Sequence, residues 1–250
     1  MPVALIVLAA GQGTRMKSDL PKVLHEVGGR PLFAHALSAE ADRKVLVIGH
    51  GAEQVRAAAA DFDPDVAIVV QEEQRGTGDA VKVARPALED FSGDVLVLFG
   101  DTPFIRAETL SRIAEARANH DIVVLGFEAA DPGRYGRLVM DGDKLQRIVE
   151  FKDATPQERD ITFCNSGIMC VDAAKMFELV GAIDDNNAAG EFYLTDVVAL
   201  GTAKGLSATA IACDEAETLG VNSRKDLAAA EATFQATARG EALELSLIHI

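Results

Sequence analysis

Cysteine is scarce in this sequence of 250 residues, which contains only Cys164, Cys170 and Cys213. If Cys164 and Cys170 share one strand, they lie about 20 Å apart, which is too far for a disulfide bond. Neither the cysteines nor the five histidines form a CxxC, HExxH or paired-histidine spacing. We therefore expect a cytoplasmic protein with reduced thiols and no zinc.

Basic residues are in deficit, since 24 Lys and Arg stand against 39 Asp and Glu, for a formal net charge of −15. This balance argues against broad binding to nucleic acid or to an anionic membrane surface. The negative net charge is compatible with binding of a phosphorylated small molecule. Charges are screened beyond about 8 Å at physiological salt, so the charges close to the site determine whether such a ligand binds.

Long apolar runs are missing as well. The apolar run Val3–Ala10 has eight residues, whereas about 20 are needed to span a bilayer. Only Met1 and Pro2 precede it, so it lacks the basic region of an export signal. The apolar content of 48% and charged content of 25% are ordinary for a globular protein. A chain of this length buries roughly 70–75% of its unfolded surface, which makes a disulfide or metal staple unnecessary.

The first half of the chain alternates apolar runs with helix-like stretches. The runs are continuous rather than alternating, which is typical of strands buried on both faces. The strand candidates are Val3–Ala9, Lys44–Ile48, Val66–Val70, Val95–Phe99 and Ile122–Phe127. The helix candidates are Pro31–Ala41, Ala52–Ala60, Asp79–Leu88 and Ala107–Ala118. This order predicts βαβ units and an α/β fold with a mostly parallel sheet.

The second half has a different character. The segments Leu138–Met140 and Lys144–Phe151 flank the turn Asp141–Asp143 and predict a β-hairpin. The remaining candidates are a strand at Ile161–Val171, helices near Asp172–Gly181 and Leu194–Lys204, a last strand at Ala208–Cys213 and a closing helix at Lys225–Ala238. No Ser/Pro-rich linker, internal repeat or low-complexity tract divides the chain, so we expect one compact unit with two lobes.

The strongest chemical signal is a glycine-rich segment that begins where the first strand ends. It reads Leu8-Ala9-Ala10-Gly11-Gln12-Gly13-Thr14-Arg15-Met16, followed by Pro21-Lys22. Glycines allow backbone N–H groups to approach a polyphosphate, and Arg15 and Lys22 add positive charge. A plain glycine-rich turn with solvated basic residues is the alternative, but the combination favours a phosphate site. The third glycine of a dinucleotide fold and the GKS or GKT of a P-loop are both missing.

Two further clusters are weaker on their own. The segment Phe99-Gly100-Asp101 ends the fourth apolar strand, and a carboxylate there suits Mg²⁺, although a turn-forming Asp before a proline is an equal alternative. Gln71 with Gly76-Thr77-Gly78 offers an amide and a backbone turn suited to the edge of a base. The alternative for that cluster is a loop and a helix start.

These residues resemble a known family. The segment Leu8–Lys22 matches the signature L-x-x-G-x-G-T-x-M-x(4)-P-K of nucleotidyltransferases that make nucleotide sugars. Within them, the chain looks like the uridylyltransferase half of the bacterial bifunctional enzyme that makes UDP-N-acetylglucosamine, from about Val3 to Arg239. The other matching segments are Ser18–His25, Gly49–Gly51, Gly76–Gly78, Tyr135–Arg137, Ile148–Glu150, Asn165–Gly167, Glu191–Asp196 and Gly220–Asn222.

The resemblance implies a role for each matching site residue. The uridine nucleotide would contact Leu8, Ala9, Ala10, Gly11, Gln71, Gly76, Thr77, Phe99, Gly100 and Asp101. The phosphates would meet Arg15 and Lys22 as catalytic residues, and Mg²⁺ would be held by Asp101 and Asn222. The amino sugar would contact Gly136, Glu150, Asn165, Tyr193 and Thr195. For Glu150 and Asn165 the alternative is ordinary strand polarity. The chain departs from the family at Phe99, Arg75 and Asp79, where tyrosine, leucine and histidine are common.

The resemblance also implies a fold and a reaction. The fold would be Rossmann-like, with a mostly parallel central sheet, helices on both faces and a smaller sugar-binding lobe that contains the β-hairpin. Residues 1–239 would form the nucleotidyltransferase domain, divided into a nucleotide-binding part at about 1–127 and a sugar-binding part at about 128–239. The substrates would be UTP and N-acetylglucosamine 1-phosphate, with Mg²⁺ as cofactor and pyrophosphate as by-product, in the supply of cell-wall precursors. No side-chain nucleophile is required.

Three other functions stay open at this point. The nearest is a nucleotidyltransferase for another sugar phosphate, such as glucose or mannose. The second is a non-catalytic nucleotide sensor, and the third is a nicotinamide-dependent oxidoreductase, whose ribose-binding acid is missing here.

The end of the chain carries separate expectations. Residues 240–250 form a tail whose apolar segment Leu245–Ile250 is either a docking strand or a truncation or cloning scar. In the resembling enzymes a β-helix acetyltransferase domain follows, and the full-length proteins form trimers. Because no hexapeptide repeat occurs in these 250 residues, we expect uridylyl transfer without acetyl transfer from them.

Overall fold

The computed structural model describes residues 1–245, and strand β1 (Val3–Ala9) lies inside its main sheet. Successive side chains of a strand point to opposite faces. Accordingly Leu5, Val7 and Ala9 pack into the core on one side of the sheet, and Ala4, Ile6 and Leu8 pack into the core on the other. Both faces are buried, which explains why this strand is apolar throughout.

Within residues 1–245, the main sheet has nine strands, seven of them in the order β11-β7-β10-β6-β1-β4-β5, while β8 pairs with β10 and β9. The pairs β1–β4, β1–β6, β4–β5 and β11–β7 are parallel, and β10 runs antiparallel to its neighbours. The further strands are β4 (Arg43–Ile48), β5 (Ala67–Val70), β6 (Asp94–Phe99), β7 (Ile122–Glu128), β8 (Arg137–Asp141), β9 (Lys144–Val149), β10 (Phe163–Asp172) and β11 (Ala208–Cys213). A separate pair is formed by β2 (Glu26–Val27) and β3 (Arg30–Pro31).

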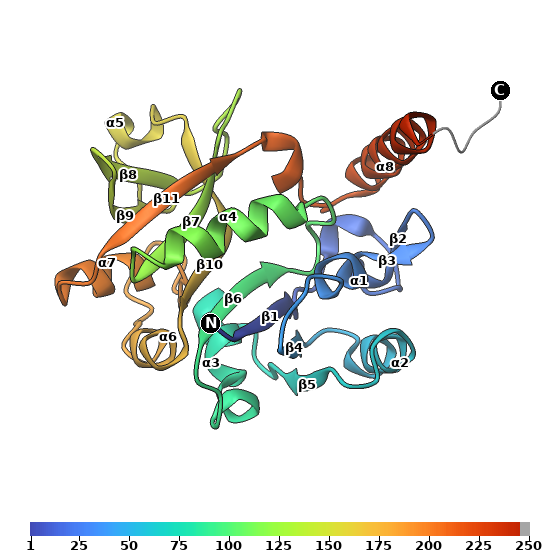
Figure 1. The fold of residues 1–250 in the computed structure, drawn as a ribbon, viewed down its shortest axis with the longest axis horizontal. Helices are drawn as coiled ribbons and strands as arrows, with labels where there is room; N and C mark the ends of the chain where they lie inside the picture. The colour runs from blue at the N-terminus through green and yellow to red at the C-terminus, as the bar shows by residue number, and fades with distance from the viewer. Residues whose placement is uncertain (246–250) are drawn as a thin grey trace.

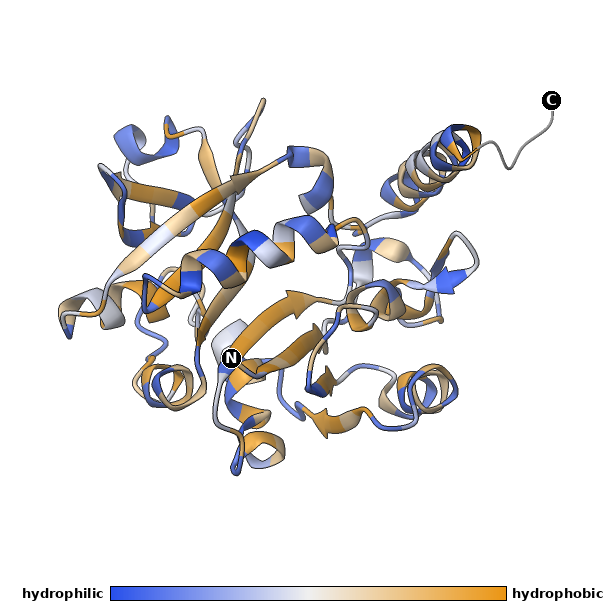
Figure 2. Cartoon of the chain, viewed as in Figure 1, coloured by the Kyte–Doolittle hydropathy of each residue, from blue (hydrophilic) through white to orange (hydrophobic). Residues whose placement is uncertain are grey.

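Helices cover both faces of this sheet (Figure 1). One face carries α1 (Leu32–Leu37), α2 (Ala52–Phe62) and α4 (Ala107–Arg117). The other carries α3 (Thr77–Val83), α6 (Ala173–Val180) and α7 (Asp196–Ala203). The short elements are α5 (Pro156–Arg159) and the 3-10 turns Thr14–Met16, Lys22–Leu24, Arg85–Leu88 and Glu215–Thr218. In Figure 2 the strands β1 and β6 are coloured hydrophobic, whereas α4 carries both colours, as expected for a helix with one buried face.

The elements agree with the sequence prediction in type, and several boundaries differ. The predicted helix Pro31–Ala41 is only Leu32–Leu37, because Ser38 donates its hydroxyl to the Ala34 carbonyl (2.7 Å) where the helix ends. The predicted helix Asp79–Leu88 divides into α3 and a 3-10 turn, since Pro86 lacks the N–H that would continue the helix.

The closing helix α8 (Arg224–Glu244) is six residues longer at its end than the predicted Lys225–Ala238. It packs against the β2–β3 pair through Leu227, Ala230 and Phe234. Gly240 lies inside the helix, because one glycine costs only about 1 kcal/mol there. The predicted tail therefore begins within α8, and residues 246–250 lie outside the described residues. In the described part of the chain, no helix combines the length and the hydropathy of a membrane span.

Candidate active site

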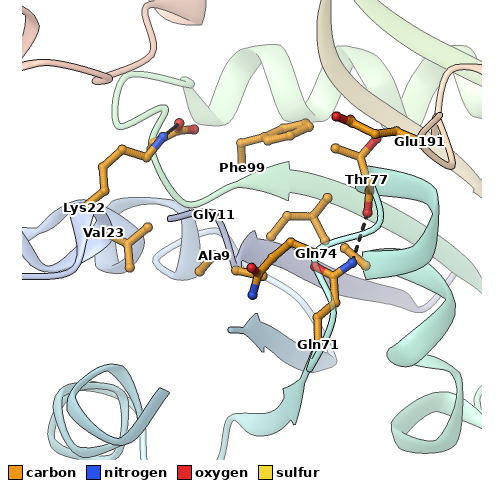
Figure 3. Close-up of a pocket in the computed structure, with 14 residues that line it drawn as sticks. Ala9, Gly11, Lys22, Val23, Gln71, Gln74, Thr77, Phe99 and Glu191 are labelled. Atoms are coloured by element: carbon orange, nitrogen blue, oxygen red, sulfur yellow. Dashed lines mark hydrogen bonds and ion pairs between the residues drawn. The ribbon is translucent and has the colours of Figure 1, made fainter. Parts of the chain in front are cut away.

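A cavity of about 320 Å³ opens where the parallel strands β1, β5 and β6 end. Ligands of open α/β sheets bind at this edge, outside the carboxyl ends of the strands. In Figure 3, Lys22 lies at one end of the cavity and Gln71 and Thr77 lie at the other. The lining residues are Leu8, Ala9, Ala10, Gly11, Lys22, Val23, Gln71, Gln74, Gly76, Thr77, Ala80, Phe99, Asp101 and Glu191. The cavity therefore gathers most of the residues predicted to hold the nucleotide and its phosphates.

The glycine-rich loop brings Lys22 to the cavity. Gly13 has a φ of 62°, in the left-handed region that favours glycine. A Cβ atom at this position would lie 2.5 Å from the Cβ of Lys22, so a side chain there would push the lysine away. From the start of α8, Arg224 donates through Nε to the Met16 carbonyl (3.0 Å) and holds the end of the loop. Sequence reasoning gave Arg224 no role, because its partner lies 208 positions away.

Lys22 joins the two residues predicted to hold Mg²⁺. Its ammonium forms an ion pair with Asp101 and donates to Oδ1 of Asn222 at 3.1 Å. The backbone supports this arrangement, because the N–H of Val221 donates to the Asp101 carbonyl at 2.9 Å. Two oxygen ligands thus converge on one positive charge. Carboxylate and amide oxygens are the ligands that Mg²⁺ accepts, with water and phosphate completing its shell. No group of three or more His, Cys, Asp or Glu residues suited to a metal occurs in residues 1–245.

Of the residues predicted to contact the nucleotide and its phosphates, two lie outside the cavity lining. Arg15 is exposed on the 3-10 turn Thr14–Met16, and it forms no ion pair with any residue of the described chain. Gly100 donates its N–H to the Leu8 carbonyl at 2.9 Å and holds the ends of β6 and β1 together. The roles predicted for both residues stay predictions.

The other end of the cavity is closed by the start of α3. Gly76 has a φ of 124°, and a Cβ there would lie 2.5 Å from the Phe192 carbonyl oxygen. The Phe192 carbonyl in turn accepts from the N–H of Gly78 at 2.8 Å. Thr77 uses its hydroxyl to accept from the backbone N–H of Leu194 at 3.0 Å. The loop before α7 is therefore bound to the nucleotide end of the site, a contact that the sequence alone did not reveal.

The residues predicted to contact the sugar form a second cluster beside the cavity. Thr195 donates its hydroxyl to Oε1 of Glu150 at 3.1 Å. The N–H of Asn165 donates to the Gly136 carbonyl at 2.8 Å. A methyl group placed on Gly136 would lie 3.5 Å from Oε1 of Glu150 and 3.5 Å from Cβ of Asn165. Four of the five predicted sugar contacts thus adjoin one another, one from β10 and three from the loops before β8, after β9 and before α7.

The second cluster has an acidic environment. Burial raises the pKa of Glu150, although its bond with Thr195 acts in the opposite direction. Burial also raises the pKa of Tyr193 to about 12, with the negative charges of Asp153 and Glu150 adding to the effect. The phenol of Tyr193 therefore stays neutral near pH 7. For Asp196 the pKa is raised too, mainly by burial.

Arg137 organises the loop next to this cluster. Its side chain is 2% exposed. The guanidinium donates to the carbonyls of Pro132 (3.2 Å), Gly133 (3.1 Å) and Arg159 (3.3 Å), and also to that of Tyr135. Loop 132–136 is therefore wrapped around one buried cation, and it ends at Gly136. In the sequence, Tyr135-Gly136-Arg137 is only a segment that matches the resembling family, and nothing in it identifies Arg137 as the residue that shapes the loop.

Known proteins are similar to this chain in sequence. The chain matches the MobA-like NTP transferase domain over residues 5–161. It is 61% identical to the Bifunctional protein GlmU of Ruegeria pomeroyi, over 99% of this chain and 56% of that protein. It is 64% identical to the protein of the same name from Cereibacter sphaeroides, over 97% of this chain and 54% of that protein. The chain thus spans about half the length of the curated relatives it matches.

Solved structures share the fold at low sequence identity. A UDP-glucose pyrophosphorylase complexed with UDP-glucose aligns with a TM-score of 0.72 and 16% identity, over 95% of this chain and all of that chain. A nucleoside-diphosphate-sugar pyrophosphorylase from Vibrio cholerae aligns with a TM-score of 0.70 and 18% identity, over 90% of this chain and 99% of the other. These likenesses confirm the predicted fold class, a mostly parallel α/β sheet of the nucleotide-diphospho-sugar transferase type.

Proposed function

Because this chain belongs to the family of MobA-like NTP transferase domains, we propose that it transfers a uridylyl group from UTP to N-acetylglucosamine 1-phosphate. The products are UDP-N-acetylglucosamine and pyrophosphate. The resemblance to a bacterial bifunctional enzyme agrees with the relatives, which carry the name Bifunctional protein GlmU.

One observation carries the proposal. Lys22 sits between Asp101 and Asn222 at one end of a cavity whose other end holds the buried amide of Gln71. A nucleoside triphosphate has matching ends, since its base needs hydrogen-bonding groups and its phosphates need positive charge. The backbone of the glycine-rich loop runs between them, where N–H groups suit phosphate oxygens.

The reaction is an in-line displacement at phosphorus. A phosphate oxygen of the sugar 1-phosphate attacks the α-phosphorus of UTP, and the bond between this phosphorus and the oxygen bridging to the β-phosphorus breaks. Pyrophosphate leaves with the electron pair of that bond. Both reactants are anions, so the main tasks are alignment and charge neutralisation. Lys22 and Arg15 supply positive charge to the phosphates, and the protein contributes no nucleophile.

Mg²⁺ fits the oxygen pair of Asp101 and Asn222, because this pair already faces a cation in the form of the Lys22 ammonium. When bound, the ion adds positive charge at the phosphates. With Mg²⁺ held by Asp101 and Asn222, the Lys22 ammonium would be available to the triphosphate, because its long unbranched side chain can reorient with the backbone unmoved.

The acidic cluster receives the sugar. Glu150 accepts from a sugar hydroxyl or from the acetamido N–H, and Asn165, Tyr193, Thr195 and the backbone of Gly136 contact the rest of the ring. The arrangement favours a sugar phosphate bound in one direction, because the acids repel its phosphate and Lys22 attracts it.

The organisation of the chain follows the same division. Residues 1–127 hold the nucleotide and residues 128–239 hold the sugar, in one nucleotidyltransferase domain. The family resemblance seen in the sequence suggests a parent protein that also acetylates glucosamine 1-phosphate and assembles as a trimer through its other half. We place the reaction in the cytoplasm, in the supply of UDP-N-acetylglucosamine for peptidoglycan and lipopolysaccharide.

The deciding experiment measures pyrophosphate release from UTP and Mg²⁺ with N-acetylglucosamine, glucosamine, glucose and mannose 1-phosphates in parallel. We expect rapid release with the first and release at least 100-fold slower with the others, because a site built to hydrogen-bond the acetamido group rejects sugars that lack it. Fastest release with glucose or mannose 1-phosphate would replace the proposed substrate. Binding of UTP without release for any sugar would indicate a nucleotide sensor.

A further inference from the structure

We propose that Asp79 determines which base this site accepts, by fixing the orientation of the Gln71 side-chain amide. The inference rests on the proposed function, in which Gln71 faces the base of the nucleotide. Asp79 is a positioning residue in this scheme, because it acts on the base through Gln71. It also stands where the resembling family commonly has histidine.

The amide of Gln71 has two acceptors on one side. Its Nε2 donates to Oδ2 of Asp79 at 2.9 Å and to the Gly76 carbonyl at 3.1 Å, and Figure 3 draws the second of these bonds. Both Gln71 and Asp79 are buried, with 3% and 5% of their surface exposed. The Gln71 amide, the Asp79 carboxylate and the Gly76 carbonyl therefore interact away from water, where a polar group without a hydrogen-bond partner costs free energy.

This arrangement permits only one orientation of the amide. A carboxylate and a backbone carbonyl can accept hydrogen bonds but cannot donate them. If the Gln71 amide were reversed, its oxygen would face two acceptors, and two buried oxygens would lose their donor. The two N–H bonds of Nε2 match the two acceptors, so the amide orientation follows from the chemistry of its neighbours.

Arg75 keeps the carboxylate of Asp79 in place. It donates to the other oxygen, Oδ1, at 2.8 Å, and its guanidinium lies 5.5 Å from the ring centroid of Phe192. The backbone carbonyl of Arg75 also accepts from the N–H of Phe192 at 2.8 Å. Each carboxylate oxygen thus has its own donor, one from Arg75 and one from Gln71.

The fixed orientation of the amide determines which Gln71 atom faces the cavity. With Nε2 directed at Asp79 and Gly76, the Oε1 atom of Gln71 is left as the side-chain atom that can serve a ligand, and it accepts from no donor within residues 1–245. Oε1 is a pure acceptor. It pairs with a base that carries an N–H on its hydrogen-bonding edge, such as N3–H of uracil. Cytosine presents an unprotonated N3 at the same place, where two lone pairs would oppose each other. The site should therefore favour UTP over CTP.

The test compares the binding of UTP and CTP by calorimetry in the absence of sugar phosphate, so that no turnover occurs. We expect the wild-type chain to bind UTP at least 100-fold more tightly than CTP. Asp79→Asn can present an N–H to Gln71 and so allows the reversed amide. Its preference for UTP should fall by about tenfold, through weaker UTP binding and tighter CTP binding. The matched control is Asp90→Asn, which removes a carboxylate that pairs with Arg43 on the surface outside the cavity and should leave the ratio unchanged.

Asp79→Ser provides a second measurement if the Asn variant does not fold, since a hydroxyl can donate as well as accept. A UTP-to-CTP ratio within twofold of wild type in a folded Asp79 variant would overturn the proposal, as would an equal loss of affinity for both nucleotides. The proposed function fails by a different result, namely UTP binding with no pyrophosphate release for any sugar phosphate. That result would leave the role of Asp79 in base selection intact.

Discussion

The cavity at the strand ends and the acidic cluster around Glu150 are neighbours that differ in their charge. The cavity is built on the ends of parallel strands, and its one lysine is held between two oxygen ligands. The cluster around Glu150 comes from the loops that flank the β8–β9 hairpin, from β10 and from the loop before α7, and burial and nearby acids raise the pKa of that glutamate. The cavity presents a lysine that is paired with an acid, whereas the cluster penalises added negative charge.

This difference explains how two anionic substrates can be distinguished. Under the proposed function, phosphate groups would be drawn to the end that carries Lys22, while hydroxyl and amide groups of the sugar would pair with the acids at the other end.

The two regions are also mechanically joined. The loop that precedes α7 bonds to α3 through Phe192 and Thr77, and its next residues reach Glu150 through Thr195. Variants at either end can thus test whether the division between nucleotide and sugar binding holds.

The largest effect is expected at the phosphate end. Arg15→Ala should lower kcat by roughly 10²–10³, because removal of one preorganised charge from a transition state has this size. The melting temperature should stay within 1–2 °C, as expected for an exposed side chain. Steady-state kinetics and a thermal melt check both, with the exposed Arg30→Ala as control. Normal turnover with reduced stability would show that Arg15 has a structural role.

Glu150→Gln tests whether the cluster around Glu150 serves the sugar phosphate and not UTP. We expect kcat/KM for N-acetylglucosamine 1-phosphate to fall by about 10–100-fold, since a hydrogen bond to a charged group is worth about 1.5–3 kcal/mol. The dissociation constant for UTP, measured by calorimetry, should stay within twofold. Glu115→Gln is the matched control on the exposed face of α4. If UTP binding weakens as much as the sugar reaction, the two regions are not separate.

Arg137→Lys should have a smaller effect on the same side. An ammonium has three donors and cannot span the four carbonyls that the guanidinium reaches. The KM for the sugar phosphate should rise about 5–10-fold while the KM for UTP is unchanged, because a distortion of loop 132–136 costs about 1–1.4 kcal/mol at the sugar. Kinetics with each substrate varied in turn measures this. An equal rise of both KM values would contradict the local role of Arg137.

The smallest effect concerns stability and pH. The raised pKa of Glu150 means that its ionised form opposes folding. This penalty is absent at low pH, grows as pH rises from the ordinary range of a glutamate to the raised pKa, and is constant above it. Relative to wild type, Glu150→Gln should therefore have a similar melting temperature at pH 4 and one about 2–4 °C higher at pH 7.5. The charges of Asp196, Asp153 and Glu191 also raise the pKa of Glu150, so the variant loses this repulsion as well. A lower melting temperature for the variant at pH 7.5 would show that the charged carboxylate stabilises the fold.

The sequence alone was sufficient to predict features that depend on residues adjacent in the chain. The strands β1 and β11 have their predicted boundaries, because a continuous run of Val, Ile, Leu and Ala is a local pattern. The glycine-rich loop was identified for the same reason, since the left-handed conformation at Gly13 is a requirement of one residue. Most of the cavity lining was named from the family resemblance, and the ends of adjacent parallel strands bring these residues together.

Tertiary structure decided the contacts between residues that are distant in the chain. Lys22 and Asn222 are 200 positions apart, and only the fold brings the amide oxygen to the ammonium. Gln71 could offer either end of its amide until α3 placed Asp79 beside it. In the sequence Arg137 is one basic residue in a motif. In the structure the surrounding loop directs its own carbonyls toward the Arg137 guanidinium. In each case the side chain's chemistry is fixed by its type, but its role depends on which donors and acceptors the fold leaves within about 3 Å.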